Sequence, residues 1–445
     1  MKLSKYNFHY KLAENTEETL IYNSRTNALA LIENENFKYL SGKTDNIVVE
    51  NKKLRKNLLR GGFLLDSNVN ELDLIKINLL KARFNNDSLG LTIAPTLACN
   101  FKCIYCYEKE NLNNSYMTEE VIQAMLEFIK KRIETITNLG ITWYGGEPLL
   151  ALDTIEYLSK EIIKMCDENN VNYNAGIITN GYSFTKEVAQ KLKDLRVEHA
   201  QITLDGTEEI HNQRRPLVNG RETFNTIIQN INDTADIMKI SIRVNTDKSN
   251  IDKLDGLLDT LISYNLHNRV HVYLGFVDSI NECYADDQCL SREGFSKLNY
   301  IAEKKLVDKG FVKSSEYKYP RLHANYCGAD NDSTYVVGPK GYIYKCYNEI
   351  GDRTAVIDSI LDTDEDFNLA LYNKYMLHMP VDDEVCSQCK LLPICMGGCP
   401  YHKITKNDKK CSEYKYSLEE YLKDTAKYLI KKRENEINEA AATKS

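Results

Sequence analysis

Ten of the thirteen cysteines in this chain fall into two groups whose spacing suits metal binding. The first group, Cys99, Cys103 and Cys106, has the pattern C-x3-C-x2-C. The second group occupies the last third of the chain and consists of Cys327, Cys346, Cys386, Cys389, Cys395, Cys399 and Cys411. The N-terminus lacks the apolar core of a signal peptide. In the reducing cytoplasm that this indicates, such a set binds metal or performs catalysis more often than it forms disulfides.

Three thiolates on one short loop can hold three irons of a 4Fe–4S cluster. The fourth iron then lacks a protein ligand, and an open metal position can bind a substrate or cofactor directly. The alternative is a zinc site completed by His9 or another distant ligand, because C-x2-C alone favours zinc. The x3–x2 spacing directly after a first predicted strand favours the cluster.

The motif with Tyr105 immediately before Cys106 resembles the signature of the radical S-adenosylmethionine (SAM) superfamily. The resemblance implies that the open iron chelates the methionine part of SAM. An electron from the cluster then cleaves SAM to a 5′-deoxyadenosyl radical, which abstracts hydrogen from the substrate. Cys99, Cys103 and Cys106 would thus form the catalytic centre, while the protein positions the cofactor.

Further residues at predicted strand ends resemble the SAM-binding positions of this superfamily. Two glycines in a GGEP motif would let the backbone approach a ligand closely, and the glutamate would accept bonds from the SAM ammonium group. An arginine at the fifth strand end suits a carboxylate. Turn formation, capping and a strand-end salt bridge are the structural alternatives. The implied cofactor-binding residues are Tyr105, Gly145, Gly146, Glu147, Asn180, Asp205 and Arg243.

The second cysteine group resembles a SPASM domain, which typically holds two auxiliary 4Fe–4S clusters; a pair of zinc sites is the alternative. The resemblance assigns the second auxiliary cluster to Cys386, Cys389, Cys395 and Cys411, and the first to Cys327, Cys346 and Cys399. The first cluster is then one thiolate short. Either Cys283 or Cys289 supplies it, or an iron stays open for a substrate thiolate. Cys166 lies in an amphipathic segment and is expected to be a buried small hydrophobe.

Strands and helices alternate from about residue 88 to 312. Six strand–helix units predict an α/β fold with a parallel sheet, and six are too few for a closed eight-stranded barrel. We therefore expect a partial (β/α)6 TIM-like barrel over 86–312 and a cysteine-rich SPASM domain over 313–445. The predicted strands are Leu89–Ala94, Gly140–Tyr144, Ala175–Thr179, Gln201–Leu204, Ile240–Asn245 and Val270–Phe276.

Residues 1–85 contain no cysteine and read as a small α+β module. Two β-like runs, Leu20–Asn23 and Ala28–Ile32, flank a turn, and helical stretches and a Gly-Gly-Phe segment follow. This order resembles the winged-helix-like RiPP recognition element, which binds the leader of a ribosomal precursor peptide, often by strand addition. A structural cap on the barrel is the alternative.

Composition narrows the class of protein. A net charge of -7 argues against nucleic-acid binding, and no apolar run approaches the ~18 residues of a membrane span. A length of 445 residues predicts two or three domains, and 42 % apolar residues suffice for sizeable cores. The missing signal peptide and membrane span indicate a cytoplasmic protein, and the resemblance to the radical SAM superfamily implies an oxidoreductase.

Together these features predict a radical SAM/SPASM peptide maturase with SAM and three 4Fe–4S clusters. It would install a thioether, of the sactipeptide or ranthipeptide type, in a Cys-containing precursor peptide, with flavodoxin or ferredoxin as reductant. The alternatives are carbon–carbon crosslinking, anaerobic sulfatase maturation and a non-catalytic iron–sulfur electron carrier. The precursor, the acceptor carbon and the oligomeric state stay open.

Overall fold

A computed structural model describes residues 1–12, 17–42, 45–279, 284–311 and 319–442 of the chain. These residues form two compact units. One unit contains the described residues of 1–83, 315–326 and 378–445, and the other those of 84–314 and 327–377. The N-terminal segment and most of the C-terminal cysteines thus fold into one unit, although they are far apart in sequence.

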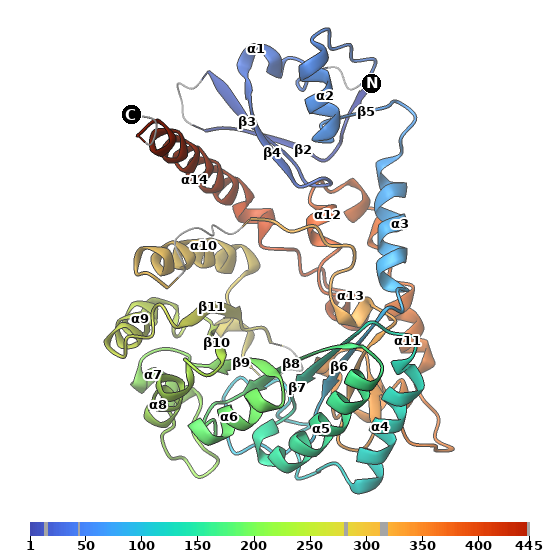
Figure 1. Cartoon of the computed structure of the whole chain (residues 1–445), viewed down its shortest axis with the longest axis vertical. Coiled ribbons are helices and arrows are strands. Elements are labelled where there is room, and N and C mark those ends of the chain that lie inside the picture. The colour runs from blue at the N-terminus through green and yellow to red at the C-terminus, as the bar shows by residue number, and fades with distance from the viewer. Residues whose placement is uncertain (13–16, 43–44, 280–283, 312–318, 443–445) are drawn as a thin grey trace. The chain divides into compact units, whose positions relative to one another are not determined.

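The larger unit is built on a nine-stranded open sheet in the order β11-β10-β9-β8-β7-β6-β12-β13-β14. Figure 1 labels β6 to β11 of this sheet. Strands β6 to β11 are parallel and adjacent in chain order. This confirms the partial, barrel-like parallel sheet expected from the alternating pattern. The six strands are β6 (Ser88–Ile93), β7 (Asn138–Trp143), β8 (Asn172–Thr179), β9 (Val197–Thr203), β10 (Lys239–Thr246) and β11 (Val270–Phe276).

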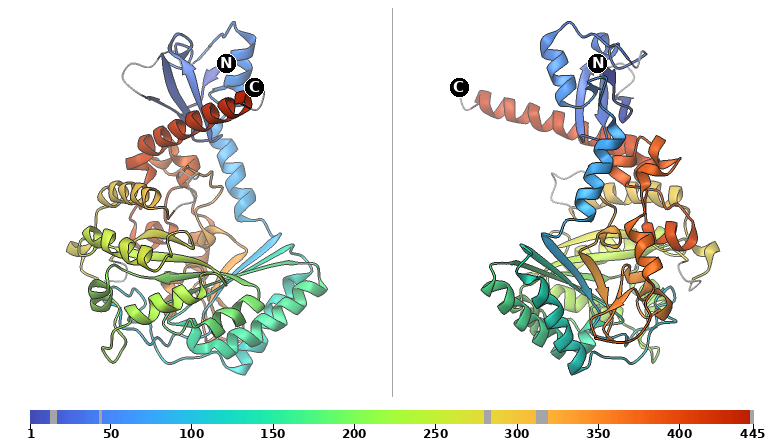
Figure 2. Two further views of the ribbon diagram at one scale, coloured as in Figure 1. Left: turned by 60° about the vertical axis from the view of Figure 1, so that its left-hand side comes forward. Right: turned by 90° about the vertical axis from the view of Figure 1, so that its right-hand side faces the viewer.

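Helices cover the outer face of this sheet (Figure 2). In α4 the apolar positions Val121, Met125 and Ile129 repeat every four residues and are buried, and Thr118 caps the first turn by accepting from Val121 N. The helices of this unit are α4 (Glu119–Ile133), α5 (Leu152–Glu168), α6 (Lys186–Asp194), α7 (Glu208–Arg214), α8 (Phe224–Thr234), α9 (Leu254–Ser263), α10 (Arg292–Asp308) and α11 (Leu369–Met376). Cys166 is fully buried within α5, as expected for a small hydrophobe.

The sequence did not predict the three strands that extend the sheet beyond β6. Strand β12 (Thr334–Val337) pairs in parallel with β6, and β13 (Tyr342–Tyr344) and β14 (Asp358–Ser359) continue antiparallel. Four, three and two residues give too short an alternation to stand out. Cys327 precedes β12 and Cys346 follows β13, so two predicted cluster ligands flank this hairpin in the sequence.

In the smaller unit, a three-stranded antiparallel sheet has the order β2-β3-β4. Its strands are β2 (Asn7–Lys11), β3 (Glu18–Asn23) and β4 (Ala28–Glu33). The last two confirm the predicted strand–turn–strand. Ile21 packs into one apolar cluster while Leu20 and Tyr22 pack into another, so both faces of β3 are covered. Around it lie β1 (Lys2–Leu3), β5 (Leu64–Leu65), α1 (Asn34–Phe37), α2 (Lys52–Arg60) and α3 (Glu71–Arg83). Winged-helix character stays a prediction.

The segment that carries the C-terminal cysteines, residues 386–411, and the last helix supply part of this unit's core. Ile394 and Leu422 pack against the sheet residues Leu20 and Tyr22. The Ser24 hydroxyl donates to the Lys390 carbonyl at 2.5 Å. The helices here are α12 (Leu392–Cys395), α13 (Pro400–Lys406) and α14 (Tyr414–Ala442), the last with a non-helical residue at Ser417. Across the described parts of both units, no helix combines the length and apolar composition of a membrane span.

Candidate active site

The first cysteine group lies in the loop that follows β6, at the carboxyl end of the parallel strands. Backbone hydrogen bonds fasten this loop to the segment after α7: Lys102 N donates to the Pro216 carbonyl at 2.9 Å, and Ile104 N to the Arg214 carbonyl at 3.0 Å. All three cysteines are partly buried and unpaired. Burial raises the pKa of the Cys99 thiol to about 12. Metal binding at this loop would therefore release protons from the thiols.

The glycines of the GGEP turn let this turn pack against the backbone of the cysteine loop. A methyl group on Gly146 would lie 2.4 Å from the Ala98 carbonyl oxygen, and one on Gly145 would lie 2.3 Å from the Thr96 carbonyl oxygen. Glu147 N also donates to the Ala98 carbonyl at 2.9 Å. The space saved by the missing side chains is thus filled by protein backbone, and these glycines set the position of the loop. Their contact with SAM stays a prediction.

Glu147 links the ends of β7 and β8. Its buried carboxylate accepts from the Thr179 hydroxyl at 2.7 Å, from Asn180 N at 2.7 Å and from Leu149 N at 3.1 Å. Burial raises the pKa of Glu147, and these hydrogen bonds oppose the rise. Asn180 in turn donates from Nδ2 to Asn100 Oδ1 at 2.8 Å, inside the cysteine loop. Three strand-end segments are thereby joined around the predicted cluster position.

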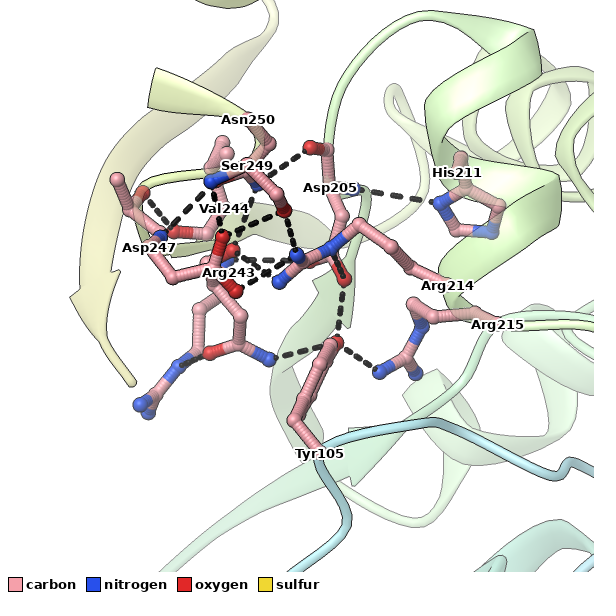
Figure 3. Close-up of polar contacts among 12 residues, drawn as sticks. Tyr105, Asp205, His211, Arg214, Arg215, Arg243, Val244, Asp247, Ser249 and Asn250 are labelled. Carbon is pink, nitrogen blue, oxygen red and sulfur yellow. Dashed lines mark hydrogen bonds and ion pairs between the residues drawn. The ribbon is translucent and has the colours of Figure 1, made fainter. Parts of the chain in front are cut away.

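Tyr105 is the centre of a buried polar network (Figure 3). Its hydroxyl donates to Asp205 Oδ2 at 2.5 Å and accepts from Arg215 at 2.7 Å and from Asn245 Nδ2 at 3.0 Å. Asp205 is fully buried, and its other oxygen accepts from Asn245 N at 3.1 Å. The tyrosine between the second and third cysteines is therefore tied to the ends of β9 and β10. Asp205 acts here within the protein, and its contact with cofactor or substrate stays a prediction.

Arg214 connects this network to the segment after β10. Its Nε lies 3.2 Å from Asp205 Oδ2, and one terminal nitrogen lies 2.7 Å from Asp247 Oδ2. His211 accepts from Asp205 N at 3.3 Å through Nδ1. Burial lowers the pKa of His211 well below its usual range, which keeps the imidazole neutral. The segment from 205 to 215 thus acts as a rigid support for the cysteine loop.

Arg243 is half-buried and directs its guanidinium away from the other side chains in Figure 3. Its Nε donates to Asn245 Oδ1 at 2.7 Å. A methyl group on Gly275 would lie 2.4 Å from this Nε, so the glycine on β11 provides the room for the side chain. Tyr273 also has a side-chain hydrogen bond with Arg243. A guanidinium has several N–H groups, so the remaining ones can bind a carboxylate. Gly275 carries no recognisable motif and could not be found from the sequence.

An aromatic cluster lies beside the cysteine loop. The ring of Tyr347, which directly follows Cys346, lies 5.7 Å from the Tyr144 ring and 6.4 Å from the Tyr107 ring. Tyr107 follows Cys106, and Tyr144 precedes the GGEP turn. Tyr347 is 50 % exposed, so part of its side chain is accessible from solvent. The sequence pattern did not single out this residue.

The C-terminal cysteines are divided between the two units. Cys327 and Cys346 belong to the larger unit; Cys386, Cys389, Cys395, Cys399 and Cys411 belong to the smaller one. Cys395 lies near Cys389 and Cys411, and burial raises the pKa of its thiol. The pairing of Cys399 with Cys327 and Cys346 stays a prediction. Cys283 lies outside the described residues, while the Cys289 thiol contacts the Ala285 carbonyl at 3.8 Å.

The donor chemistry of the first loop fits a 4Fe–4S cluster, because three thiols on one loop can each bind a separate iron. A buried cation beside these thiols, Arg215, has an Nε–H without a hydrogen-bond partner among the described residues. Within the same described residues, no three His, Cys, Asp or Glu side chains converge as the ligands of a single ion would. The thiolate ligands of a 4Fe–4S cluster each bind a different iron, so they need not converge on a single point.

Comparison with known proteins decides the class of this domain. Residues 93–261 match the Radical SAM superfamily, and this range includes the three cysteines, the GGEP turn and the Tyr105 network. The chain contains a radical SAM domain. Domains of this superfamily use SAM and a 4Fe–4S cluster.

The similar proteins differ in how much of this chain they match. The radical SAM cyclopropyl synthase TigE of Paramaledivibacter caminithermalis is 23 % identical over 89 % of this chain and 87 % of that protein. A cysteine-type anaerobic sulfatase-maturating enzyme of Clostridium perfringens is 23 % identical over 74 % of this chain and 95 % of that protein. By contrast, the chain spans about half of a GTP 3′,8-cyclase of Nautilia profundicola, at 29 % identity and 49 % coverage of that enzyme.

Two solved structures share the fold. Native anSMEcpe with bound AdoMet and the Cp18Cys peptide has a TM-score of 0.58 and 17 % identity, over 76 % of this chain and 99 % of that chain. SuiB of Streptococcus suis bound to the precursor peptide SuiA has a TM-score of 0.52 and 15 % identity, over 89 % of this chain and 95 % of that chain.

Proposed function

We propose that this radical SAM enzyme modifies a ribosomal precursor peptide and installs a thioether between a cysteine and another residue of it. The observation that carries the proposal is the likeness to peptide-bound SuiB, which extends over 89 % of this chain. The uncovered part is shorter than the N-terminal 83 residues of the smaller unit. Part of that segment therefore belongs to the shared fold, which supports a role for it in holding a leader.

The residues of the chain have defined parts in this proposal. Cys99, Cys103 and Cys106 would bind the cluster, and Glu147, Asn180 and Tyr105 would hold its loop in place. The half-buried Arg243 would bind the SAM carboxylate with N–H groups that Asn245 and Tyr273 do not use. When bound, the cluster and SAM supply a 5′-deoxyadenosyl radical that removes a hydrogen atom from a peptide carbon. The half-exposed side chain of Tyr347 would contact the peptide beside this position.

Thioether formation removes two hydrogens from the peptide. One leaves as a hydrogen atom to the radical. The cysteine thiol loses the other as a proton when the C–S bond forms, and the remaining electron passes to a one-electron acceptor such as an oxidised iron–sulfur cluster. Cys327, Cys346 and Cys399 would hold the first auxiliary cluster, with its fourth position open or filled by Cys283 or Cys289. Cys386, Cys389, Cys395 and Cys411 would hold the second.

The test is anaerobic incubation of the reconstituted enzyme with SAM, dithionite and synthetic peptides encoded by the open reading frames beside its gene. We expect 5′-deoxyadenosine and a peptide lighter by two hydrogen atoms, whose cysteine no longer reacts with iodoacetamide. Replacing Cys99, Cys103 and Cys106 together by Ala should abolish both products, whereas Cys166→Ala, which changes a buried cysteine in α5, should not. A lighter peptide with a reactive cysteine would exclude the thioether.

A second candidate function is sulfatase maturation. It is favoured by the similarity to the Clostridium perfringens enzyme, which spans 95 % of that protein. The same incubation with a synthetic sulfatase peptide distinguishes the two functions. Oxidation of cysteine to formylglycine removes sulfur from the peptide, while a thioether retains it.

A further inference from the structure

Arg215 is a buried cation that the polar network leaves without an ionic partner. It directly follows α7 and is 7 % exposed. Its backbone is fixed, because its N–H donates to the His211 carbonyl at 2.8 Å and its carbonyl accepts from the Thr223 hydroxyl at 2.8 Å. The side chain therefore points in a set direction, toward the cysteine loop.

The carboxylates nearby are bound to a different arginine. Asp205 and Asp247 pair with Arg214, and none of the ion pairs among the described residues includes Arg215. The guanidinium of Arg215 instead donates to the Tyr105 hydroxyl at 2.7 Å and lies 5.7 Å from the centre of the Phe101 ring. Its Nε–H is buried without a hydrogen-bond partner among the described residues. A buried charge and a buried donor both destabilise a protein unless a partner arrives.

The cysteine loop is the segment beside which this charge lies. Its two ring contacts, Phe101 and Tyr105, stand on either side of Cys103 in the sequence. The Ile104 N–H also donates to the carbonyl of Arg214, the residue before Arg215, at 3.0 Å. These contacts hold the Arg215 side chain against the part of the loop that carries Cys103. An anionic group held by these thiols would satisfy both its charge and its free donor.

We propose that Arg215 is the counter-cation of the iron–sulfur cluster held by Cys99, Cys103 and Cys106, and that it donates Nε–H to a sulfur of that site. Three thiolates outweigh the positive charge of an oxidised cluster core, so the site is a net anion. One-electron reduction adds another negative charge. A fixed cation and a hydrogen bond to sulfur both favour the reduced form, because net charge and hydrogen bonds to the sulfurs set the potential of such clusters. Arg215 therefore makes the reduction that precedes SAM cleavage easier.

This inference rests on the cluster-binding part of the proposed function and not on the peptide. The experiment is a redox titration of the reconstituted full-length enzyme, followed by electron paramagnetic resonance. The signal used is the component that changes when SAM is added, which separates this cluster from any other. The variants are Arg215→Gln, which removes the charge, and Arg215→Lys, which keeps it. Arg196→Gln is the control, because Arg196 pairs with Asp167 on the surface of the same unit, where water screens the charge.

At a fixed potential, we expect the ratio of reduced to oxidised cluster to fall at least tenfold in Arg215→Gln. This corresponds to a midpoint about 59 mV lower for a one-electron couple. Arg215→Lys should keep most of the wild-type ratio, and Arg196→Gln should keep all of it. A change of less than twofold in Arg215→Gln would overturn the proposal.

If Arg215→Gln lacks the SAM-responsive cluster, the Arg215→Lys variant tests the proposal instead. A ratio of reduced to oxidised cluster near the wild-type value in Arg215→Lys supports the proposal, because a positive charge alone then keeps the cluster reducible. Absence of the cluster in Arg215→Lys as well overturns it, since Arg215 would then be needed to form the site and not to set the potential of its cluster. Because no peptide enters this experiment, failure of the peptide-modification proposal leaves its outcome unaffected.

Discussion

Gly146→Ala tests whether the GGEP turn sets the position of the cysteine loop. The added methyl group would lie 2.4 Å from the Ala98 carbonyl oxygen and 2.8 Å from its carbonyl carbon. Real Cβ atoms stay at least 3.0 Å from such atoms, so turn and loop must separate by at least 0.6 Å. Both contacts are backbone atoms, which cannot rotate aside. Gly146 has an ordinary negative or extended φ, unlike Gly145 with φ 113°, so the substitution adds the clash without backbone strain.

The loop that moves carries Cys99 immediately after Ala98. A misplacement of about 1 Å can cost on the order of 100-fold in rate, so 0.6 Å predicts a loss of roughly tenfold or more. Overpacking should also destabilise the unit by about 1–3 kcal/mol. We expect 5′-deoxyadenosine formation with SAM and dithionite to fall accordingly, at near-normal iron content, together with a lower melting temperature.

Gly140→Ala is the matched control, since a methyl group there would meet no atom within 4 Å. Gly140 lies in β7, and Gly146 lies in the turn that follows this strand. Wild-type rate and melting temperature in Gly146→Ala would refute the reasoning. An equal loss of rate and melting temperature in Gly140→Ala would also refute the reasoning, because the effect would then not come from the clash with the cysteine loop.

Two further predictions concern the aromatic cluster and the smaller unit. Tyr347→Ala should raise the KM for the converted peptide about tenfold, because an exposed aromatic ring is lost. Tyr347→Phe should keep the wild-type KM, and SAM cleavage without peptide should be unchanged in both variants. An unchanged KM in Tyr347→Ala would argue against contact with the peptide. Cys389→Ala should speed amide hydrogen exchange in β2, β3 and β4. The reason is that Ser24 donates a hydrogen bond to Lys390 and Tyr22 packs with Ile394, both close to Cys389 in sequence. Exchange as slow as in Cys166→Ala would show that the sheet does not depend on this segment.

The parallel sheet was predictable because its strands are marked by strong local patterns. Each has several buried apolar residues, as in β10, where Ile240, Ile242 and Val244 alternate with less buried positions. The cysteine loop, the GGEP turn and the residues at strand ends were found in the same way. Strands β12 to β14 were missed, since two to four residues carry no readable period and their partner β6 is remote in sequence.

The roles of the glycines and of Arg215 could not be read from local pattern. The approach of Gly145 and Gly146 to a ligand stays a prediction, and the sequence did not indicate that methyl groups added to them would meet the carbonyls of Thr96 and Ala98. Arg214 and Arg215 are adjacent and chemically identical, yet only one pairs with carboxylates. Such differences depend on what the fold brings near each side chain, which no spacing encodes.

The grouping of the N-terminal segment with the C-terminal cysteines was also not predictable. It affects how a leader-binding role can be tested. Removing residues 1–85 would expose Ile394 and Leu422, which pack against Leu20 and Tyr22. The deletion would therefore disturb the predicted ligands of the second auxiliary cluster together with the sheet. Substitutions on an edge strand of the intact chain are the cleaner perturbation.

The pairing of β12 with β6 has a consequence for synthesis of the chain. Strand β6 ends at Ile93, but its partner spans Thr334–Val337, so about 240 further residues must leave the ribosome before this pair can form. At ~5–20 residues per second, the edge of β6 waits roughly 12 to 48 seconds for its partner. An unpaired edge is a template for association with other chains during that time. Nascent copies on neighbouring ribosomes are therefore the main hazard, and shielding of this edge by a chaperone would favour correct assembly.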